Sequence, residues 1–183
     1  MRNRFLAAAA ALMLLTGPSF AQETDNSKAA IEAMSKVTTA QDFVSHAAMS
    51  DMFEIRTGQM AQEKGGSDAV KQFGQMLVQD HGNSSKELMD LAKAAGVDAA
   101  PPEALDQRHQ VIADSLEGAE AQGFDQAFGQ AQVQAHQEGI ALFEAYAQNG
   151  DNEQLKAFAQ KGLPVLQKHL ETAQQIAGTG QTQ

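Results

Sequence analysis

Apolar residues recur at three- and four-residue steps along most of the chain, which is the spacing of one face of an α-helix. Four long segments carry this pattern, at about residues 40–64, 68–95, 124–148 and 152–177. Thr39 and Ser67 stand where the first two helices would need capping residues, and Asp151 stands before the fourth. The pattern predicts an all-α protein.

The connections between these segments predict the topology. Gly65-Gly66 and Asn149-Gly150 make tight turns, whereas about 27 residues join the second segment to the third. Pro101 and Pro102 suit the start of a short helix at about 103–117 inside that connection. Two helical hairpins joined by one long crossover form a four-helix bundle of the ferritin-like kind. We expect the bundle domain to span residues 40–177, followed by a disordered tail at 178–183.

The first 21 residues have the three parts of an export signal. Arg2 and Arg4 precede an apolar run, and a Gly-Pro break then leads to small residues at Ser19 and Ala21. We expect cleavage after Ala21, which would release a periplasmic protein that begins with a polar leader at residues 22–39. The apolar run is too short to serve as a mature transmembrane anchor, and no cysteine follows it for lipid attachment.

The charge and the lack of cysteine narrow the possible partners. The formal charge of −10 would become −12 once Arg2 and Arg4 leave with the signal. A protein this acidic is repelled by phosphate backbones, so we do not expect it to bind nucleic acid. The chain contains no cysteine, which excludes zinc and iron sites built on thiolates. A protein partner or a homo-oligomer stays open.

Each long segment places one ionisable side chain on its apolar face, and these are Glu54, His81, His136 and His169. At a rise of about 1.5 Å per residue, the first three lie about 20 Å from the same end of the bundle, and the fourth about 12 Å. Three neutral imidazoles and one carboxylate suit zinc, iron or copper. We therefore hypothesise that these four side chains hold a metal ion, with Asp80 or Gln132 orienting a ring.

A purely structural role is the main alternative for the same histidines. They would then make interhelical hydrogen bonds to Glu54, Gln132 or Ser84 and fix the register of the helices, because buried polar groups need partners. The Glu-x-x-His pairs of di-iron bundles are absent, which disfavours a di-iron oxidase. His46 falls one step off the apolar face of its helix and His109 lies in the short crossover helix, so we expect both to be solvated.

Two further features have less specific interpretations. Gly82, directly after His81, is expected to let a neighbouring helix approach closely. The methionines on the helices, among them Met49, Met52 and Met60, could bind copper(I), but without a closely spaced run they are expected to fill the core. No catalytic triad or phosphate-binding loop stands out, so an enzyme is only the third hypothesis, as an oxidase or hydrolase that would depend on the metal site. The alternatives are a metal- or ligand-binding protein and a structural, interaction or envelope-stress module.

Several short motifs resemble those of a known family. They are Asp80-His81, Phe124-Asp125, Ala135-His136, and the stretch from Leu163-Pro164 to His169-Leu170. Over about residues 41–175 the chain is similar to the exported bacterial proteins of domain of unknown function 4142, which are often labelled outer-membrane proteins. The resemblance implies a ferritin-like bundle and brings no established reaction or ligand. The family's recurring histidines and its glutamate correspond to the same four residues that the apolar faces select.

Overall fold

The computed structural model describes residues 20–179, and every element of regular secondary structure in that range is a helix. The elements are α1 (Phe20–Met34), α2 (Ala40–Lys64), α3 (Asp68–Ala94), α4 (Gln107–Gly118), α5 (Ala121–Asn149) and α6 (Glu153–Thr179). The all-α prediction is confirmed. The predicted export signal lies almost entirely outside the described residues, as do the last four residues of the predicted tail.

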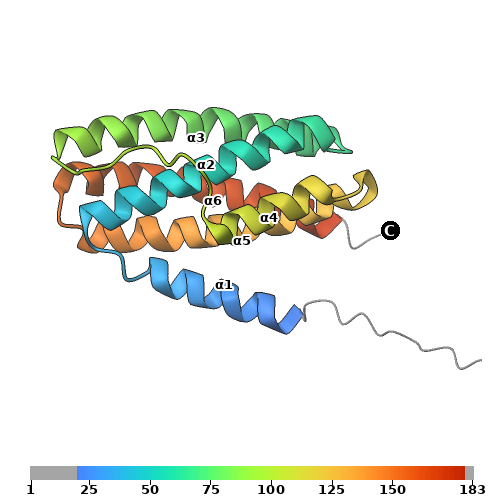
Figure 1. Ribbon diagram of the computed structural model, residues 1–183, viewed down its shortest axis with the longest axis horizontal. Helices are drawn as coiled ribbons and strands as arrows, with labels where there is room; N and C mark the ends of the chain where they lie inside the picture. Colours follow the sequence, from blue (N-terminus) through green and yellow to red (C-terminus); the bar gives the residue numbers. More distant parts are fainter. Residues whose placement is uncertain (1–19, 180–183) are drawn as a thin grey trace, which may run out of the picture.

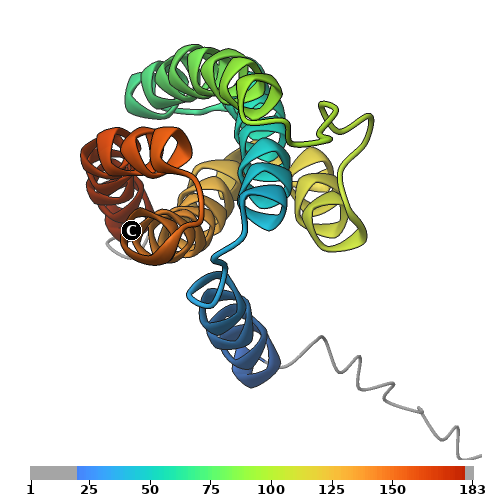
Figure 2. The same cartoon turned by 90° about the vertical axis from the view of Figure 1, so that its left-hand side faces the viewer.

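The four long helices run side by side (Figure 1). α2 packs along α3 and α5 packs along α6, while α2–α5 and α3–α6 contacts join the two hairpins. Figure 2 shows α4 against the outer side of α2, and α1 packs against α5 at the edge of the bundle. Within residues 20–179, no helix combines the length and the apolar character that crossing a bilayer needs.

Side chains fix the ends of the helices at several turns. The hydroxyl of Thr39 accepts a hydrogen bond from the backbone N–H of Asp42 at 3.2 Å, and Ser67 does the same for Val70 at 3.3 Å. Both predicted caps are therefore confirmed. The carboxylate of Asp125 on α5 also accepts from the N–H groups of Gly66 and Ser67, which ties the α2–α3 turn to the second hairpin.

One predicted helix cap and one predicted helix start are wrong. The cap of α6 is Asn152, whose side-chain oxygen is 3.1 Å from the N–H groups of Gln154 and Leu155. Asp151 instead accepts from the N–H of Ala40, which joins the start of α2 to the α5–α6 turn. The short helix begins at Gln107 and not near residue 103, because Asp106 caps it and both prolines lie before it.

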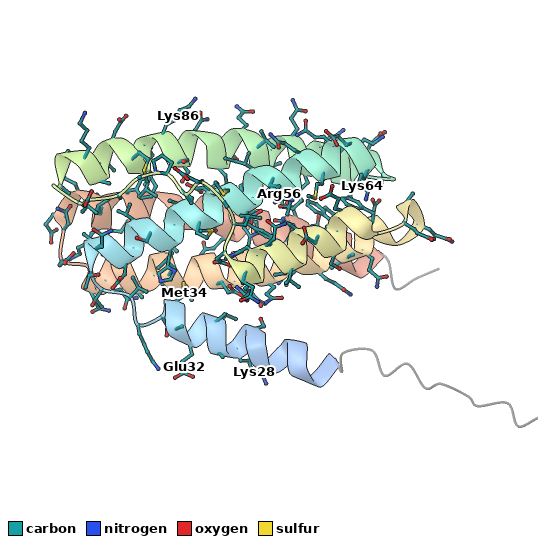
Figure 3. All side chains as sticks on the ribbon, viewed as in Figure 1. Lys28, Glu32, Met34, Arg56, Lys64 and Lys86 are labelled. Atoms are coloured by element: carbon teal, nitrogen blue, oxygen red, sulfur yellow. The ribbon has the colours of Figure 1, made fainter. Side chains whose placement is uncertain are left out.

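Two cations on α2 hold the crossover helix in place, and Figure 3 shows Arg56 and Lys64 beside α4. The guanidinium of Arg56 donates to the side chain of Gln110 at 3.0 Å and lies 3.6 Å from the carboxylate of Glu117. The ammonium of Lys64 donates to the backbone carbonyls at the end of α4, at 3.2 Å for Leu116. Cations are favoured at this end of a helix, because its carbonyls lack intrahelical partners.

The apolar core is divided into two clusters along the bundle. One includes Phe43, Leu88, Phe143 and Leu155, and the other includes Phe73, Leu77, Phe128 and Ile176. In each long helix, the residues between the two clusters include buried polar side chains. These are Asp51, Glu54 and Thr57 in α2, His81 in α3, Gln132, His136 and Glu138 in α5, and His169 in α6. A polar layer therefore crosses the middle of the bundle.

Two glycines allow α2 and α3 to approach closely. A Cβ atom on Gly74 would meet the carbonyl oxygen of Gly58 at 2.5 Å, and one on Gly58 would meet the carbonyl oxygen of Gly74 at 2.8 Å. The prediction for Gly82 is wrong, because a Cβ atom there would have no neighbouring atom within 4 Å. The close approach lies two turns away from Gly82, at Gly74.

These two glycines give a matched pair of substitutions. We expect Gly74→Ala to lower the free energy of unfolding by about 1–3 kcal/mol, because the added methyl group forces the two backbones apart. Gly82→Ala should instead raise it by up to about 1 kcal/mol, because alanine favours a helix interior and the space is open. Urea unfolding of both variants tests this expectation, and equal effects would contradict it.

Candidate metal centre

Three histidines from three helices meet in the polar layer. His81 comes from α3, His136 from α5 and His169 from α6, and all three are buried. Their ring centroids lie 5.3–5.9 Å apart, and one nitrogen of each ring lies within 4.8 Å of a nitrogen of both other rings. The ring of Phe73 packs against His136 and His169 and closes one side of the cluster.

One nitrogen of each ring is held by an oxygen atom outside the cluster. Nδ1 of His81 is 2.8 Å from Oδ1 of Asp51, and Nε2 of His169 is 3.1 Å from Oδ2 of Asp80. Nδ1 of His136 is 2.9 Å from the backbone carbonyl oxygen of Gln132, one turn earlier in α5. An oxygen acceptor behind each ring is the usual arrangement around histidines that bind metals, because it fixes the tautomer and the direction of the ring.

The second nitrogen of each ring is buried and has no hydrogen-bond partner among the described residues. These atoms are Nε2 of His81, Nε2 of His136 and Nδ1 of His169. A carbonyl oxygen can only accept a hydrogen bond, so Nδ1 of His136 carries the proton and Nε2 has a free lone pair. Buried polar atoms normally have partners, so the three unpaired ring nitrogens in one layer make these histidines candidate ligands for a metal ion.

Burial controls the protonation of two of these rings. It lowers the pKa of His136 to about 3 and that of His169 to about 4, and the charge of His81 acts in the same direction on both. Both rings are therefore neutral near pH 7, which is the form that binds metals. Burial also acts to lower the pKa of His81, but the hydrogen bond to Asp51 and the charges of Glu54 and Asp51 outweigh it and raise that pKa.

Glu54 lies in the same layer, next to the outer side of the cluster. Its Oε1 is 3.7 Å from Nδ1 of His136, the nitrogen that faces the carbonyl of Gln132, and its Oε2 is buried without a hydrogen-bond partner. Burial raises the pKa of Glu54 to about 7. The side-chain amide of Gln132 donates to the hydroxyl of Thr57 at 2.9 Å, so this residue holds His136 through its backbone and α2 through its side chain.

Asp51 is the residue that the sequence analysis missed. It is 4% exposed and makes the shortest contact to the cluster, and burial raises its pKa. A sequence signal for it exists, because Ala47, Asp51, Glu54, Gly58 and Ala61 follow one another at steps of four and three residues. All five are buried. Ser50, one residue earlier, is only half-buried.

A pocket leads from the surface to the cluster. Its volume is about 260 Å³, and both His81 and His169 line it. Its other walls are largely apolar, and Lys161 and Glu87 lie at its exposed edge, where the ammonium is 2.9 Å from the carboxylate. The cluster can therefore be reached from outside between the two hairpins.

The remaining candidate ligands lie elsewhere. His46 is exposed, as predicted, but His109 is half-buried, because its ring packs 5.0 Å from that of Phe53 and 2.8 Å from the carboxylate of Asp106. Four of the helical methionines are spread over both apolar clusters, whereas Met49 and Met52 belong to neither. Met34 and Met89 pack on the first, and Met60 and Met76 pack on the second. This distribution fits core filling better than a copper(I) site.

The comparisons with known proteins identify a family without an assigned activity. A family model described as a domain of unknown function (DUF4142) matches residues 23–176. No curated protein and no solved structure matches the chain significantly. The matched range includes all three clustered histidines together with Asp51, Glu54 and Asp80. The chain belongs to the family of domain of unknown function DUF4142.

Proposed function

We propose that this protein binds one divalent transition-metal ion, zinc, copper or iron, through His81, His136 and His169. The observation that carries the proposal is the set of three unpaired, buried ring nitrogens, each opposite a nitrogen that an oxygen acceptor already holds. Nitrogen ligands of this kind suit all three metals. Glu54 lies behind His136, so we assign it to charge balance and ring orientation and not to the ligand set.

The unpaired polar atoms of this layer favour a metal-binding function over a role that only fixes the register of the helices. Hydrogen bonds that only fixed the register would satisfy the polar groups they bury, whereas six buried side-chain atoms stay unpaired in this layer. Burying unpaired polar atoms destabilises a protein. A bound cation would pair with the ring nitrogens and attract the neighbouring carboxylates, and so would remove that cost.

The proposal extends to the setting of the site. The four long helices, joined pairwise and connected by a crossover that contains α4, fit a ferritin-like bundle, and such bundles hold metals on inward-facing side chains. The N-terminal sequence supports export, so we place the bound metal in the periplasm. Three protein ligands beside an open pocket favour a site that can exchange its ion or bind a further ligand over a closed structural site.

Equilibrium titration tests the proposed function. We expect metal-free protein to bind one zinc ion per chain in competition with a chromophoric chelator, and His136→Gln to weaken binding at least a hundredfold. His46→Gln is the matched control, because His46 is exposed on α2 and outside the cluster. Equal zinc binding by both variants would place the metal elsewhere. No binding by the wild-type protein, with copper and iron also tested, would leave the histidines with a structural role.

The buried carboxylate behind His81 gives a further prediction. We expect Asp51→Asn to weaken zinc binding by about 10–100-fold, because the amide no longer fixes the tautomer or the charge of the ring. Circular dichroism of the metal-free variant should match that of the wild type. The matched control is Asp42→Asn, at an exposed residue in the first turn of the same helix. Unchanged zinc affinity in Asp51→Asn would show that the carboxylate does not support a ligand.

A further inference from the structure

The pocket beside the histidine cluster has walls suited to a small organic molecule. Apolar side chains from three of the four long helices line it, namely Ala47, Phe143, Phe158, Val165 and Leu166. Gly139 and Gly162 lie among them. An apolar cavity of roughly 150 Å³ holds a benzene molecule, so about 260 Å³ accommodates roughly ten non-hydrogen atoms.

The charges around the pocket disfavour an anionic ligand. Three carboxylates line it, those of Asp51, Asp80 and Glu87. The one lysine of the lining, Lys161, is already paired, with its ammonium 2.9 Å from both carboxylate oxygens of Glu87. Its side chain is also 70% exposed, so it lies at the rim and not beside the histidines. In the metal-loaded protein, the carboxylates of Asp51 and Asp80 would balance the two positive charges of the ion, so an anion entering this pocket would find no net positive charge to pair with.

The histidines in the pocket lining determine which donor atom a ligand needs. His81 and His169 are buried residues of its lining, and each has one ring nitrogen without a partner among the described residues. If those nitrogens bind a metal as proposed, three protein ligands leave a coordination position open to a fourth. Among uncharged donors, aromatic nitrogen is the one that zinc, copper and iron all bind well.

We propose that the pocket binds a small, uncharged nitrogen heterocycle, whose ring packs against Phe143 and Phe158 while its nitrogen completes the coordination of the metal. This inference rests on the proposed metal site. The apolar walls bind the body of the ligand, the carboxylates exclude anions of the same size, and the metal selects molecules with a donor atom.

Cobalt(II) loading makes the inference measurable, because the visible absorption of cobalt reports its coordination. We expect isoquinoline, with ten non-hydrogen atoms, to change the spectrum of the cobalt-loaded protein and to bind at least tenfold more tightly than pyridine or benzoate. Pyridine has the donor without the larger apolar body, and benzoate has a negative charge. Naphthalene, which has the shape of isoquinoline without its nitrogen, should leave the spectrum unchanged.

A variant at the pocket mouth separates this inference from the metal site. Val165 is 41% exposed and lines the pocket, so Val165→Trp should narrow the entrance and weaken isoquinoline binding at least tenfold. Cobalt affinity should not change. Val111→Trp is the matched control, because Val111 is 63% exposed and lies on α4 away from this pocket.

The outcomes distinguish the two proposals. If the cobalt-loaded protein does not bind isoquinoline, or binds benzoate or pyridine as tightly as isoquinoline, the inference is overturned. The proposed metal site is not affected by that result. Equal isoquinoline affinity in the two tryptophan variants also overturns it, because the ligand would then bind elsewhere. A protein that binds no cobalt removes the metal site and the inference together.

Discussion

Zinc at about a hundred times its dissociation constant should raise the free energy of unfolding by about 2.7 kcal/mol, and His136→Gln should abolish this gain. The metal stabilises the folded state because the three rings meet only when α3, α5 and α6 are packed together. The unfolded chain has no comparable site. Urea unfolding with and without zinc measures the effect.

Glutamine is chosen at residue 136 so that the variant loses the metal ligand but still folds. The ring packs in the polar layer and is 1% exposed, so glutamine is preferred to alanine because it leaves less empty space. His46→Gln, on the exposed side of α2, should keep the full stabilisation by zinc. If zinc stabilises both variants equally, the ion does not bind at the cluster.

The metal-free protein should also show an unusual dependence on pH. Burial holds the pKa of His136 at about 3, below its ordinary value of 6.5. In this pH range the imidazole of His136 is protonated in the unfolded state and not in the folded state. Its contribution to the free energy of unfolding is therefore lost as the pH falls from about 6.5 towards 3. Between pH 7 and pH 4, the loss is about 3 kcal/mol.

A comparison with His136→Gln isolates this contribution, because other groups titrate in the same range. The stability of the wild type relative to the variant should decrease as the pH falls. The stability of the wild type relative to Glu54→Gln should instead decrease as the pH rises. Burial raises the pKa of Glu54 from 4.5 to about 7, so its contribution is lost as the pH rises through that interval. Parallel pH profiles for the wild type and His136→Gln would contradict the assignment of a buried, neutral imidazole.

Much of the fold follows from local sequence signals. Thr39, Ser67 and the glycine turns fix helix ends through contacts within a few residues, and the apolar spacing of each helix determines which face is buried. The errors occur where the deciding contact is remote in sequence. Asp151 bonds Ala40, 111 residues away, and so leaves the capping of α6 to Asn152.

The sequence predicts which histidines form the cluster, but it does not predict how their rings are oriented or held. Helical spacing placed His81, His136 and His169 on buried faces, and the structure brings all three together. The height of His169 was underestimated in part because α6 extends to Thr179, and two more residues add about 3 Å. Which oxygen holds which ring depends on how neighbouring helices are rotated. Asp80 therefore holds His169 and not the adjacent His81, and Asp51 had no assigned role.

The most direct test of the metal site is X-ray absorption spectroscopy of the protein loaded with one equivalent of zinc. We expect three imidazole ligands with zinc–nitrogen distances of about 2.0–2.1 Å, and the loss of this signature in His136→Gln. A coordination shell made of oxygen atoms, unchanged by the substitution, would show that zinc binds surface carboxylates and not the three histidines.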